Sequence, residues 1–313
     1  MEERSKGGSH GEVMKVKRDF DVPGFKVGGF HSDKAESGLT FIFTSEENVA
    51  GMSQRGQSPG TRETDLLRSG HRKNRSVNGI VLSGRSIFGL KLVDRLVERL
   101  YQDGYGIRVG EIRIPIVPAA VIFDFQNNYE MPDDEWADRA FDSLGSKIAI
   151  GREWAGRGAT VGKFVDGINP TPSGQGFSTI KYGRVFFSVI CVVNAYGSVY
   201  DTKGKIIAGP KDSNGMYIDP IERGMKNDIR FSPFSNTTIG VLLTNIKASP
   251  EEMSILAESV NQAFSRRIIP FNTEFDGDTF FAVSLNTEDF PFYKAFVSVQ
   301  KVASDAISSI FGD

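Results

Sequence analysis

The feature of this sequence that most limits its fold is a set of short runs rich in Val, Ile and Phe, interleaved with segments of helical periodicity. Such runs are typical of buried strands. The predicted strands are residues 39–44, 78–83, 112–125, 185–194, 239–245 and 279–285. The predicted helices are residues 92–100, 137–144, 250–264 and 297–310. Because strands and helices do not alternate as strictly as in a Rossmann-type sheet, the pattern predicts a layered α+β fold.

The start of one helix is marked by several signals together. Residues 249–252 (SPEE) form a capping box with proline at the first helical position. An apolar face follows at helical spacing, made by Met253, Leu256, Val260 and Phe264. The two helices before it are expected to end before Gly104 and at Gly145, because glycine favours helix termination.

Composition indicates an ordinary soluble globular protein. Hydrophobic residues make up 39% and charged residues 24%, and the net charge of −2 gives no reason to expect nucleic acid or an anionic membrane as a partner. Neither a signal-like N-terminus nor a membrane-length apolar stretch is present, so a cytoplasmic location is expected. The single cysteine, Cys191, lies in an apolar run and is predicted to be a buried, inert thiol. Residues 1–18 are predicted to be a disordered tail and 19–313 a single domain.

Several classes of catalytic site are disfavoured by what the sequence lacks. The three histidines, His10, His31 and His71, have no second histidine or cysteine at ligand-like spacing, so neither a metal site nor a cofactor is predicted. A Ser-His-Asp triad through His31 or His71 stays open, although no G-x-S-x-G turn accompanies either. No Walker loop and no strand–GxGxxG–helix unit is present.

Two long polar stretches, residues 45–78 and 201–236, interrupt the pattern, and the second ends against a predicted strand at Asn236-Thr237-Thr238. A threonine hydroxyl is a weak nucleophile, but the α-amino group of an N-terminal threonine can serve as its base. A cut between Asn236 and Thr237 would create that amine. The same residues are also compatible with a simple turn or with a glycosylation sequon.

A series of short motifs supports the nucleophile interpretation. In chain order they are 60–67 (GTRETDLL), 80–90 (IVLSGRSIFGL), 117–124 (VPAAVIFD), 158–163 (GATVGK), 193–197 (VNAYG), 236–241 (NTTIGV) and 276–281 (DGDTFF). The sequence from about Val27 to Ser284 resembles the DmpA-type L-aminopeptidase/D-amidase/D-esterase family, which includes the NylC-type nylon-oligomer hydrolases. The resemblance implies an αββα sandwich shared with ornithine acetyltransferases and autocleavage into residues 1–236 and 237–313. It also implies a homotetramer of the processed heterodimers.

Details within the motifs resemble the nylon-hydrolase branch. Thr237 follows the cut where the aminopeptidase branch has Ser, and the downstream acidic positions are Asp rather than Glu. There are also departures from the family pattern. Arg85 stands in a segment that is usually Gly-Gly-Ser-Ala-Phe-Gly-Leu, and residues 151–158 (GREWAGRG) replace a loop of small residues. These larger side chains are expected to narrow or recharge the cleft.

The resemblance also implies roles for individual residues. Thr237 is the expected nucleophile. Asp276 and Asp278, two positions apart, are expected to orient its hydroxyl or to bind an ammonium group of the substrate. Lys163 is expected to lower the pKa of the new amine or to stabilise an oxyanion, and Asn194 to donate its amide to that oxyanion. Without the resemblance, a surface Asp-Gly-Asp turn, a solvated lysine and an asparagine at a strand end are the simpler interpretations.

The function predicted from the sequence is an autoprocessing N-terminal-threonine amide hydrolase. Its expected substrates are short peptides or aminohexanoate oligomers, cut through an acyl-Thr intermediate and faster when the amino end is free. Two alternatives remain. One is an acyltransferase of the ornithine-acetyltransferase type, which would pass the acyl group to an amine instead of water. The other is a non-catalytic binding protein on a degenerate copy of the fold, which the substitutions at Arg85 and in residues 152–157 would favour.

Overall fold

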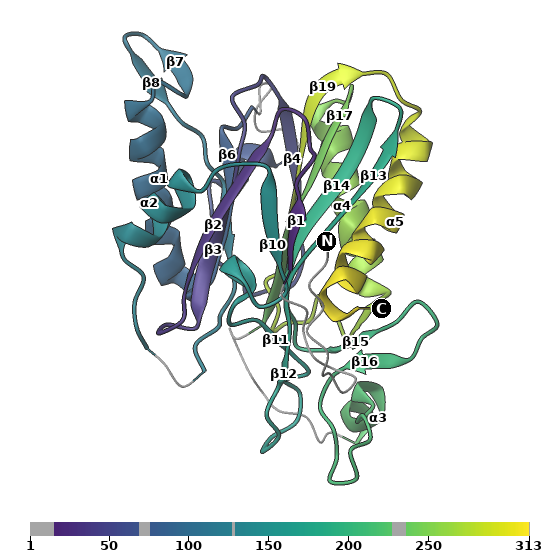
Figure 1. The fold of residues 1–313 in the computed structure, drawn as a ribbon. Coiled ribbons are helices and arrows are strands. Elements are labelled where there is room, and N and C mark those ends of the chain that lie inside the picture. Colours follow the sequence, from purple (N-terminus) through teal and green to yellow (C-terminus); the bar gives the residue numbers. More distant parts are fainter. Residues whose placement is uncertain (1–15, 69–75, 127–128, 227–235, 313) are drawn as a thin grey trace.

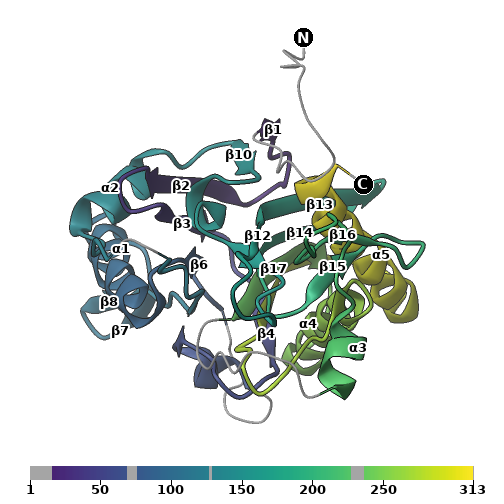
Figure 2. The same cartoon turned by 90° about the horizontal axis from the view of Figure 1, so that it is seen from below.

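The computed structural model describes residues 16–68, 76–126, 129–226 and 236–312. Two five-stranded sheets pack face to face, and helices cover the outer face of each sheet (Figures 1 and 2). The layers therefore follow the order helix, sheet, sheet, helix, and the predicted αββα sandwich is confirmed. In the described ranges no helix combines the length and the apolar character needed to cross a membrane.

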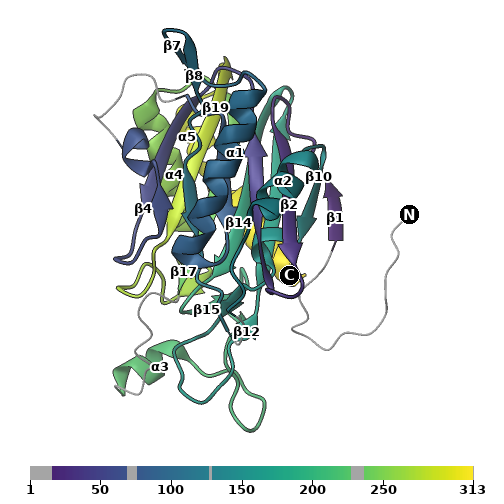
Figure 3. The ribbon, with the colours of Figure 1, turned by 90° about the vertical axis from the view of Figure 1, so that its left-hand side faces the viewer.

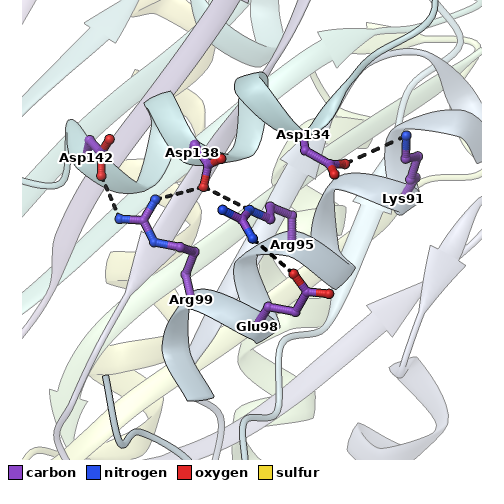
Figure 4. A network of polar contacts seen from close by, with 7 residues as sticks. All are labelled: Lys91, Arg95, Glu98, Arg99, Asp134, Asp138 and Asp142. Carbon is purple, nitrogen blue, oxygen red and sulfur yellow. Dashed lines mark hydrogen bonds and ion pairs between the residues drawn. The ribbon is translucent and has the colours of Figure 1, made fainter. Parts of the chain in front are cut away.

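The first sheet has the strand order β2-β3-β6-β9-β5, with one parallel pair, β6 and β9. Its strands are β2 (Lys26–Ser32), β3 (Ser37–Phe43), β6 (Gly79–Ser83), β9 (Ala119–Val121) and β5 (Thr61–Arg62). Helices α1 (Lys91–Gln102) and α2 (Asp134–Asp142) cover its outer face (Figure 3). Ion pairs join the two helices (Figure 4): Asp138 accepts from Arg95 at 3.0 Å and from Arg99 at 2.7 Å, and Arg99 also binds Asp142 at 2.7 Å. These pairs are partly exposed and each contributes little stability.

The second sheet has the strand order β13-β14-β17-β19-β4. Its strands are β13 (Gly174–Tyr182), β14 (Val185–Asn194), β17 (Thr237–Ile246), β19 (Thr279–Glu288) and β4 (Val49–Gln54). Helices α4 (Pro250–Ser265) and α5 (Phe292–Phe311) cover its outer face. Strand β17 lies at the centre, antiparallel to β14 and parallel to β19.

The alternation of side chains along β17 and β14 decides which residues face the space between the sheets. Ile239, Val241 and Leu243 of β17 belong to the core between the sheets, whereas Leu242 packs under the outer helices. On β14 the even-numbered residues, such as Val192, face inward. Because successive side chains of a strand point to opposite faces, Thr237 and Asn194 are directed to the inner face, at the end of the core.

Smaller elements gather mainly at the end of the sheets where β14 ends and β17 begins (lower end in Figure 1). They are β11 (Thr160–Val161), β12 (Thr171–Pro172), β15 (Ser198–Tyr200), β16 (Ile206–Ala208), β18 (Ile268–Ile269) and α3 (Pro220–Met225). Elsewhere lie β1 (Val16–Asp19), β10 (Lys147–Ile150), β7 (Ile107–Val109), β8 (Ile112–Ile114) and the 3₁₀ turns Thr64–Leu67, Ser86–Leu90 and Trp154–Gly156. The chain ends of β14 and β17 are thus surrounded by loops and short strands.

Some predictions about single elements are wrong. The strand predicted at residues 112–125 is two short strands, β8 and β9, separated by Pro115 and Pro118, which cannot donate ladder hydrogen bonds. The polar stretch 45–78 contains β4, whose Gly51 lies against α4, where an added Cβ would come 2.4 Å from the Ser254 nitrogen. Close helix packing there selects small residues, so the strand lacks the apolar pattern.

Other boundaries also differ. The polar stretch 201–236 contains β16 and α3, and its residues 227–235 lie outside the described residues, as do 69–75 of the first stretch. Of the predicted tail, residues 1–15 lie outside the described residues, but residues 16–18 belong to β1, which pairs with β10. The prediction for Cys191 is confirmed: the thiol is fully buried, and burial raises its pKa to about 12.

Candidate active site

Thr237 and Asn194 lie opposite each other at the lower end of the second sheet. Thr237 is the first residue of β17, Asn194 is the last residue of β14, and the two are register partners in the antiparallel ladder. Thr237 has an exposed fraction of 5% in the uncleaved chain. The expected nucleophile is therefore fixed by a rigid strand at the edge of the core, next to one of its expected partners.

The carbonyl group of Asn236 is held from two sides. The hydroxyl of Thr237 donates a hydrogen bond to the Asn236 carbonyl oxygen. The backbone N–H of Gly277 donates to the same oxygen at 3.2 Å, and Asn236 forms an isolated parallel bridge with Asp276. The peptide bond expected to be cut thus lies directly against the hydroxyl expected to attack it.

The side-chain amide of Asn194 is fixed at both ends. Its Oδ1 accepts from Lys163 Nζ at 2.8 Å and from the Thr160 N–H at 3.1 Å, while its Nδ2 donates to the Phe123 carbonyl at 3.1 Å. Lys163 also donates to the Asn194 carbonyl at 3.2 Å. Lys163 is buried, so the interpretation as a solvated surface lysine is wrong. The role of Asn194 as an oxyanion donor stays a prediction.

Asp276 is buried and hydrogen-bonded through both carboxylate oxygens. Its Oδ2 accepts from the Thr273 hydroxyl at 2.6 Å and the Thr273 N–H at 3.0 Å, and its Oδ1 accepts from the Tyr196 N–H at 3.4 Å. Burial raises the pKa of Asp276, whereas these hydrogen bonds and the charge of Lys163 oppose the rise. Lys163 and Asp276 are therefore close enough to interact electrostatically.

Asp278 is buried next to the negative charge of Asp276. Its Oδ1 accepts from the Thr238 N–H at 2.6 Å and its Oδ2 from the Asn272 N–H at 3.1 Å. Burial and the neighbouring charge of Asp276 raise the pKa of Asp278 well above its ordinary value. The charge of Lys163 opposes the rise in the pKa of Asp276, whereas the charge of Asp276 adds to the rise in the pKa of Asp278, so the pKa of Asp278 is raised further.

The burial of the two carboxyl groups corrects one expectation. Asp276 and Asp278 are both 0% exposed, so the interpretation as a surface turn is wrong. The uncleaved chain also leaves neither of them accessible to a substrate's ammonium group. Their remaining expected role is at Thr237, whose own amino group would be freed beside them.

The departure at Arg85 does not recharge an open cleft as expected, whereas Arg152 and Arg157 of residues 151–158 are half-buried and the expectation for that loop stays a prediction. Arg85 is fully buried, its N–H donates to Asp124 Oδ1 at 2.8 Å, and its guanidinium lies 4.5 Å above the Phe125 ring. Arg85 adopts a left-handed conformation with φ 61°, which explains why the family pattern has glycine there. Trp154 is also buried, against Gly29.

Sequence reasoning missed the backbone groups of the site. The backbone N–H groups of Gly277, Asn272 and Tyr196 cannot be recognised from residue types. The spacing Thr273-x-x-Asp276 is the one signal in the sequence, and in the structure the Thr273 hydroxyl donates to Asp276 at 2.6 Å. Over the described ranges, no group of three or more His, Cys, Asp or Glu side chains is arranged to hold a metal ion.

The raised pKa of Asp278 leads to a prediction about stability. The folded protein keeps this proton to higher pH than the unfolded chain, so the stabilisation is complete below the ordinary carboxyl pKa of about 4 and is lost as pH rises through the raised pKa. We expect the Tm of the wild type to fall with rising pH relative to that of Asp278→Asn. Tm measured by scanning calorimetry at several pH values tests this, with Asp103→Asn, at an exposed carboxyl, as the matched control. Parallel curves for wild type and Asp278→Asn would contradict it.

The sequence profile of peptidase family S58 matches residues 20–312. The 6-aminohexanoate-oligomer endohydrolase of Paenarthrobacter ureafaciens is 30% identical over 306 residues, which cover 93% of this chain and 82% of the relative. An uncharacterized aminopeptidase of Mycobacterium tuberculosis is 29% identical over 282 residues, covering 84% and 80% of the two chains.

Solved structures share the fold at low sequence identity. A β-aminopeptidase of Burkholderia sp. superposes with a TM-score of 0.67 at 15% identity, covering 98% of this chain and 88% of the other. The L-aminopeptidase D-Ala-esterase/amidase of Ochrobactrum anthropi gives a TM-score of 0.63 at 16% identity, covering 93% and 84%. The second structure is described as a variant of the Ntn hydrolase fold, in agreement with the layers seen here.

Proposed function

We propose that this chain, which belongs to peptidase family S58, is a self-processing amide hydrolase in which Thr237 becomes the N-terminal nucleophile. The membership and the relatives support a hydrolase of peptide or amide bonds. Cleavage of the chain and an acyl-Thr intermediate are our proposals. The observation that carries them is the contact between the Thr237 hydroxyl and the Asn236 carbonyl group.

Processing would proceed as an N→O acyl shift followed by hydrolysis. The Thr237 Oγ1 attacks the Asn236 carbonyl carbon, the Asn236–Thr237 C–N bond breaks, and the hydroxyl proton ends on the departing nitrogen. Water then hydrolyses the resulting ester, which yields the Asn236 carboxylate, a free Thr237 hydroxyl and a free α-amino group. The contact places the reacting groups next to each other before any movement, which is the main requirement of such a reaction.

The same groups would serve turnover of an external amide. The freed amine of Thr237 acts as the general base for its own hydroxyl, with an unperturbed pKa of about 8. Lys163 is a buried cation held on Asn194, and a nearby positive charge favours the neutral form of an amine that must accept a proton. Asp276, hydrogen-bonded to Thr273 and Tyr196, balances the charge of Lys163.

The names of the relatives support the proposed substrate class, whereas the proposed assembly rests on the family resemblance of the sequence. The endohydrolase of Paenarthrobacter ureafaciens is named for 6-aminohexanoate oligomers and the mycobacterial relative as an aminopeptidase. We therefore propose linear aminohexanoate oligomers and short peptides as substrates. We further propose that residues 1–236 and 237–313 stay together and form a homotetramer, which the native mass of the purified protein would test.

The denatured mass of the purified protein tests the proposal directly. We expect two fragments, residues 1–236 and 237–313, the second of which begins Thr-Thr-Ile-Gly by Edman sequencing. With an amide substrate we expect release of free acid, and no gain in rate or new product when ornithine is added as an acyl acceptor. A fully active protein that remains one intact chain would rule out the mechanism, and acyl transfer to the added amine would favour an acyltransferase.

A further inference from the structure

We propose that the backbone N–H of Gly277 is the oxyanion donor of the self-processing step, and that the loop of residues 55–58 holds this N–H in place. The inference rests on the proposed function, because it assigns a catalytic group to the cleavage of the Asn236–Thr237 bond. It concerns a backbone group, so it was not accessible from residue types in the sequence.

The donor already points at the atom that would carry the charge. Gly277 N lies 3.2 Å from the carbonyl oxygen of Asn236, and the attacking hydroxyl of Thr237 contacts the same carbonyl group. When Oγ1 adds to the carbonyl carbon, this oxygen becomes an oxyanion. A preorganised donor in a buried site stabilises such a charge strongly, and loss of one donor typically costs about 10²–10³ in rate.

The peptide group that carries this N–H is fixed at its other end. The Asp276 carbonyl oxygen, in the same peptide group, accepts a hydrogen bond from the Ser58 N–H at 3.0 Å. The peptide group is thus held between the Ser58 N–H and the Asn236 carbonyl. Since hydrogen bonds in series polarise one another, the bond from Ser58 also strengthens the Gly277 donor.

Residues 55–58 also form hydrogen bonds to the turn of residues 274–278, on both sides of this peptide group. The Arg55 N–H donates to the Asp278 carbonyl at 2.8 Å, and the Ser58 hydroxyl donates to the Glu274 carbonyl at 3.2 Å. The loop belongs to the future fragment 1–236 and the turn to 237–313. The contact between the two parts of the chain therefore sets the position of the donor.

Two glycines allow the loop to approach so closely. A Cβ at Gly56, which has φ +81°, would lie 2.2 Å from the Asp276 carbonyl oxygen, and a Cβ at Gly277 would lie 2.4 Å from the Ser58 carbonyl oxygen. Both contacts are with backbone atoms, which cannot swing aside as a flexible side chain can. Any side chain at position 56 must therefore displace the peptide group that carries the donor.

The first test compares Gly56→Ala with Gly204→Ala. Gly204 has nearly the same φ, +83°, but an added Cβ there has nothing within 4 Å. Both variants place an alanine at positive φ, and only the first displaces the peptide group. We expect the processing rate of Gly56→Ala, followed by intact mass after a pulse of cell-free synthesis, to fall at least about tenfold, while Gly204→Ala matches the wild type.

A second pair removes a single hydrogen bond. Ser58→Pro lacks the N–H that binds the Asp276 carbonyl, whereas Ser58→Ala keeps it and loses only the bond to Glu274. We expect slow processing in Ser58→Pro and near-normal processing in Ser58→Ala. Added hydroxylamine should not restore the rate in Ser58→Pro or Gly56→Ala, because it cleaves the ester and the slowed step is the acyl shift before it.

The outcomes separate this inference from the proposed function. Processing of Gly56→Ala and Ser58→Pro at the wild-type rate, or rescue of both by hydroxylamine, would overturn the role of Gly277 and leave self-processing intact. A wild type that is never processed would overturn both. The Tm of Gly56→Ala is compared with that of Gly204→Ala, and a variant that fails to fold leaves the decision to the Ser58 pair.

Discussion

Thr237→Ala is expected to purify as one full-length chain without measurable amide hydrolysis. The substitution removes the hydroxyl that contacts the Asn236 carbonyl, so the acyl shift has no nucleophile and no amino terminus is created. For turnover the loss is expected to reach at least about 10⁴-fold, because both the nucleophile and its base are absent. Intact-mass spectrometry measures the processing, and release of free acid from a linear amide measures the activity.

Two variants control for the substitution itself. Thr237→Ser keeps a hydroxyl and should still be processed. Thr238→Val changes the next residue of β17. The buried hydroxyl of Thr238 has no hydrogen-bond partner in the described part of the chain. The substitution keeps the hydrogen bond from the backbone N–H of residue 238 to Asp278. It should be processed and active within about threefold of the wild type, as for a substitution that touches no functional group. Processing of Thr237→Ala together with a block in Thr238→Val would show that the nucleophile has been assigned to the wrong threonine.

Lys163→Met is expected to lower kcat by at least about a hundredfold. Methionine fills a similar volume but lacks the charge, so the Asn194 amide loses its 2.8 Å donor and Asp276 loses the cation that offsets its charge. Asp276 should then hold a proton to higher pH, and the pH at which kcat reaches half its maximum should shift. The measurement is the pH dependence of kcat with a linear amide substrate.

The matched control for this variant is Lys34→Met. Lys34 forms an ion pair with Glu130 at 3.0 Å, but its side chain is 83% exposed, and such pairs contribute about 0–1 kcal/mol. Its pH profile and kcat should be those of the wild type. A Lys163→Met enzyme with normal kcat and an unchanged profile would remove Lys163 from the reaction.

The parts of the fold that the sequence predicts well are those governed by local physical chemistry. The start of α4 is an example: Ser249 accepts from the Glu252 N–H at 3.2 Å and the Glu252 carboxylate accepts from the Ser249 N–H at 2.8 Å, so the capping box is confirmed. Strand β14 begins and ends where the apolar run at residues 185–194 does, because all of its residues are buried.

The parts that could not be predicted depend on contacts between distant segments. Strand β4 has small residues because α4 lies against it, and the sequence around Gly51 shows no sign of that helix. Asp276-Gly277-Asp278 has the composition of a surface turn, but it is buried and contacts residues 55–58 as well as Tyr196 and Thr238. The family resemblance assigned functional roles to Thr237 and Lys163, and the structure shows which residues each of them contacts.

The position of β17 and β19 has a consequence for how the protein would unfold after the proposed cut. Both strands come from residues 237–313, and they are inserted between β14 and β4, which come from residues 1–236. The proposed cut would release no piece, because the ladder would remain continuous across the two polypeptides. The strands would no longer be tethered at Thr237, so refolding would become a bimolecular reaction that slows on dilution. The cut would therefore be an irreversible step that occurs only after the chain has folded. The lifetime of the cut protein would then be set by its unfolding rate rather than by an equilibrium.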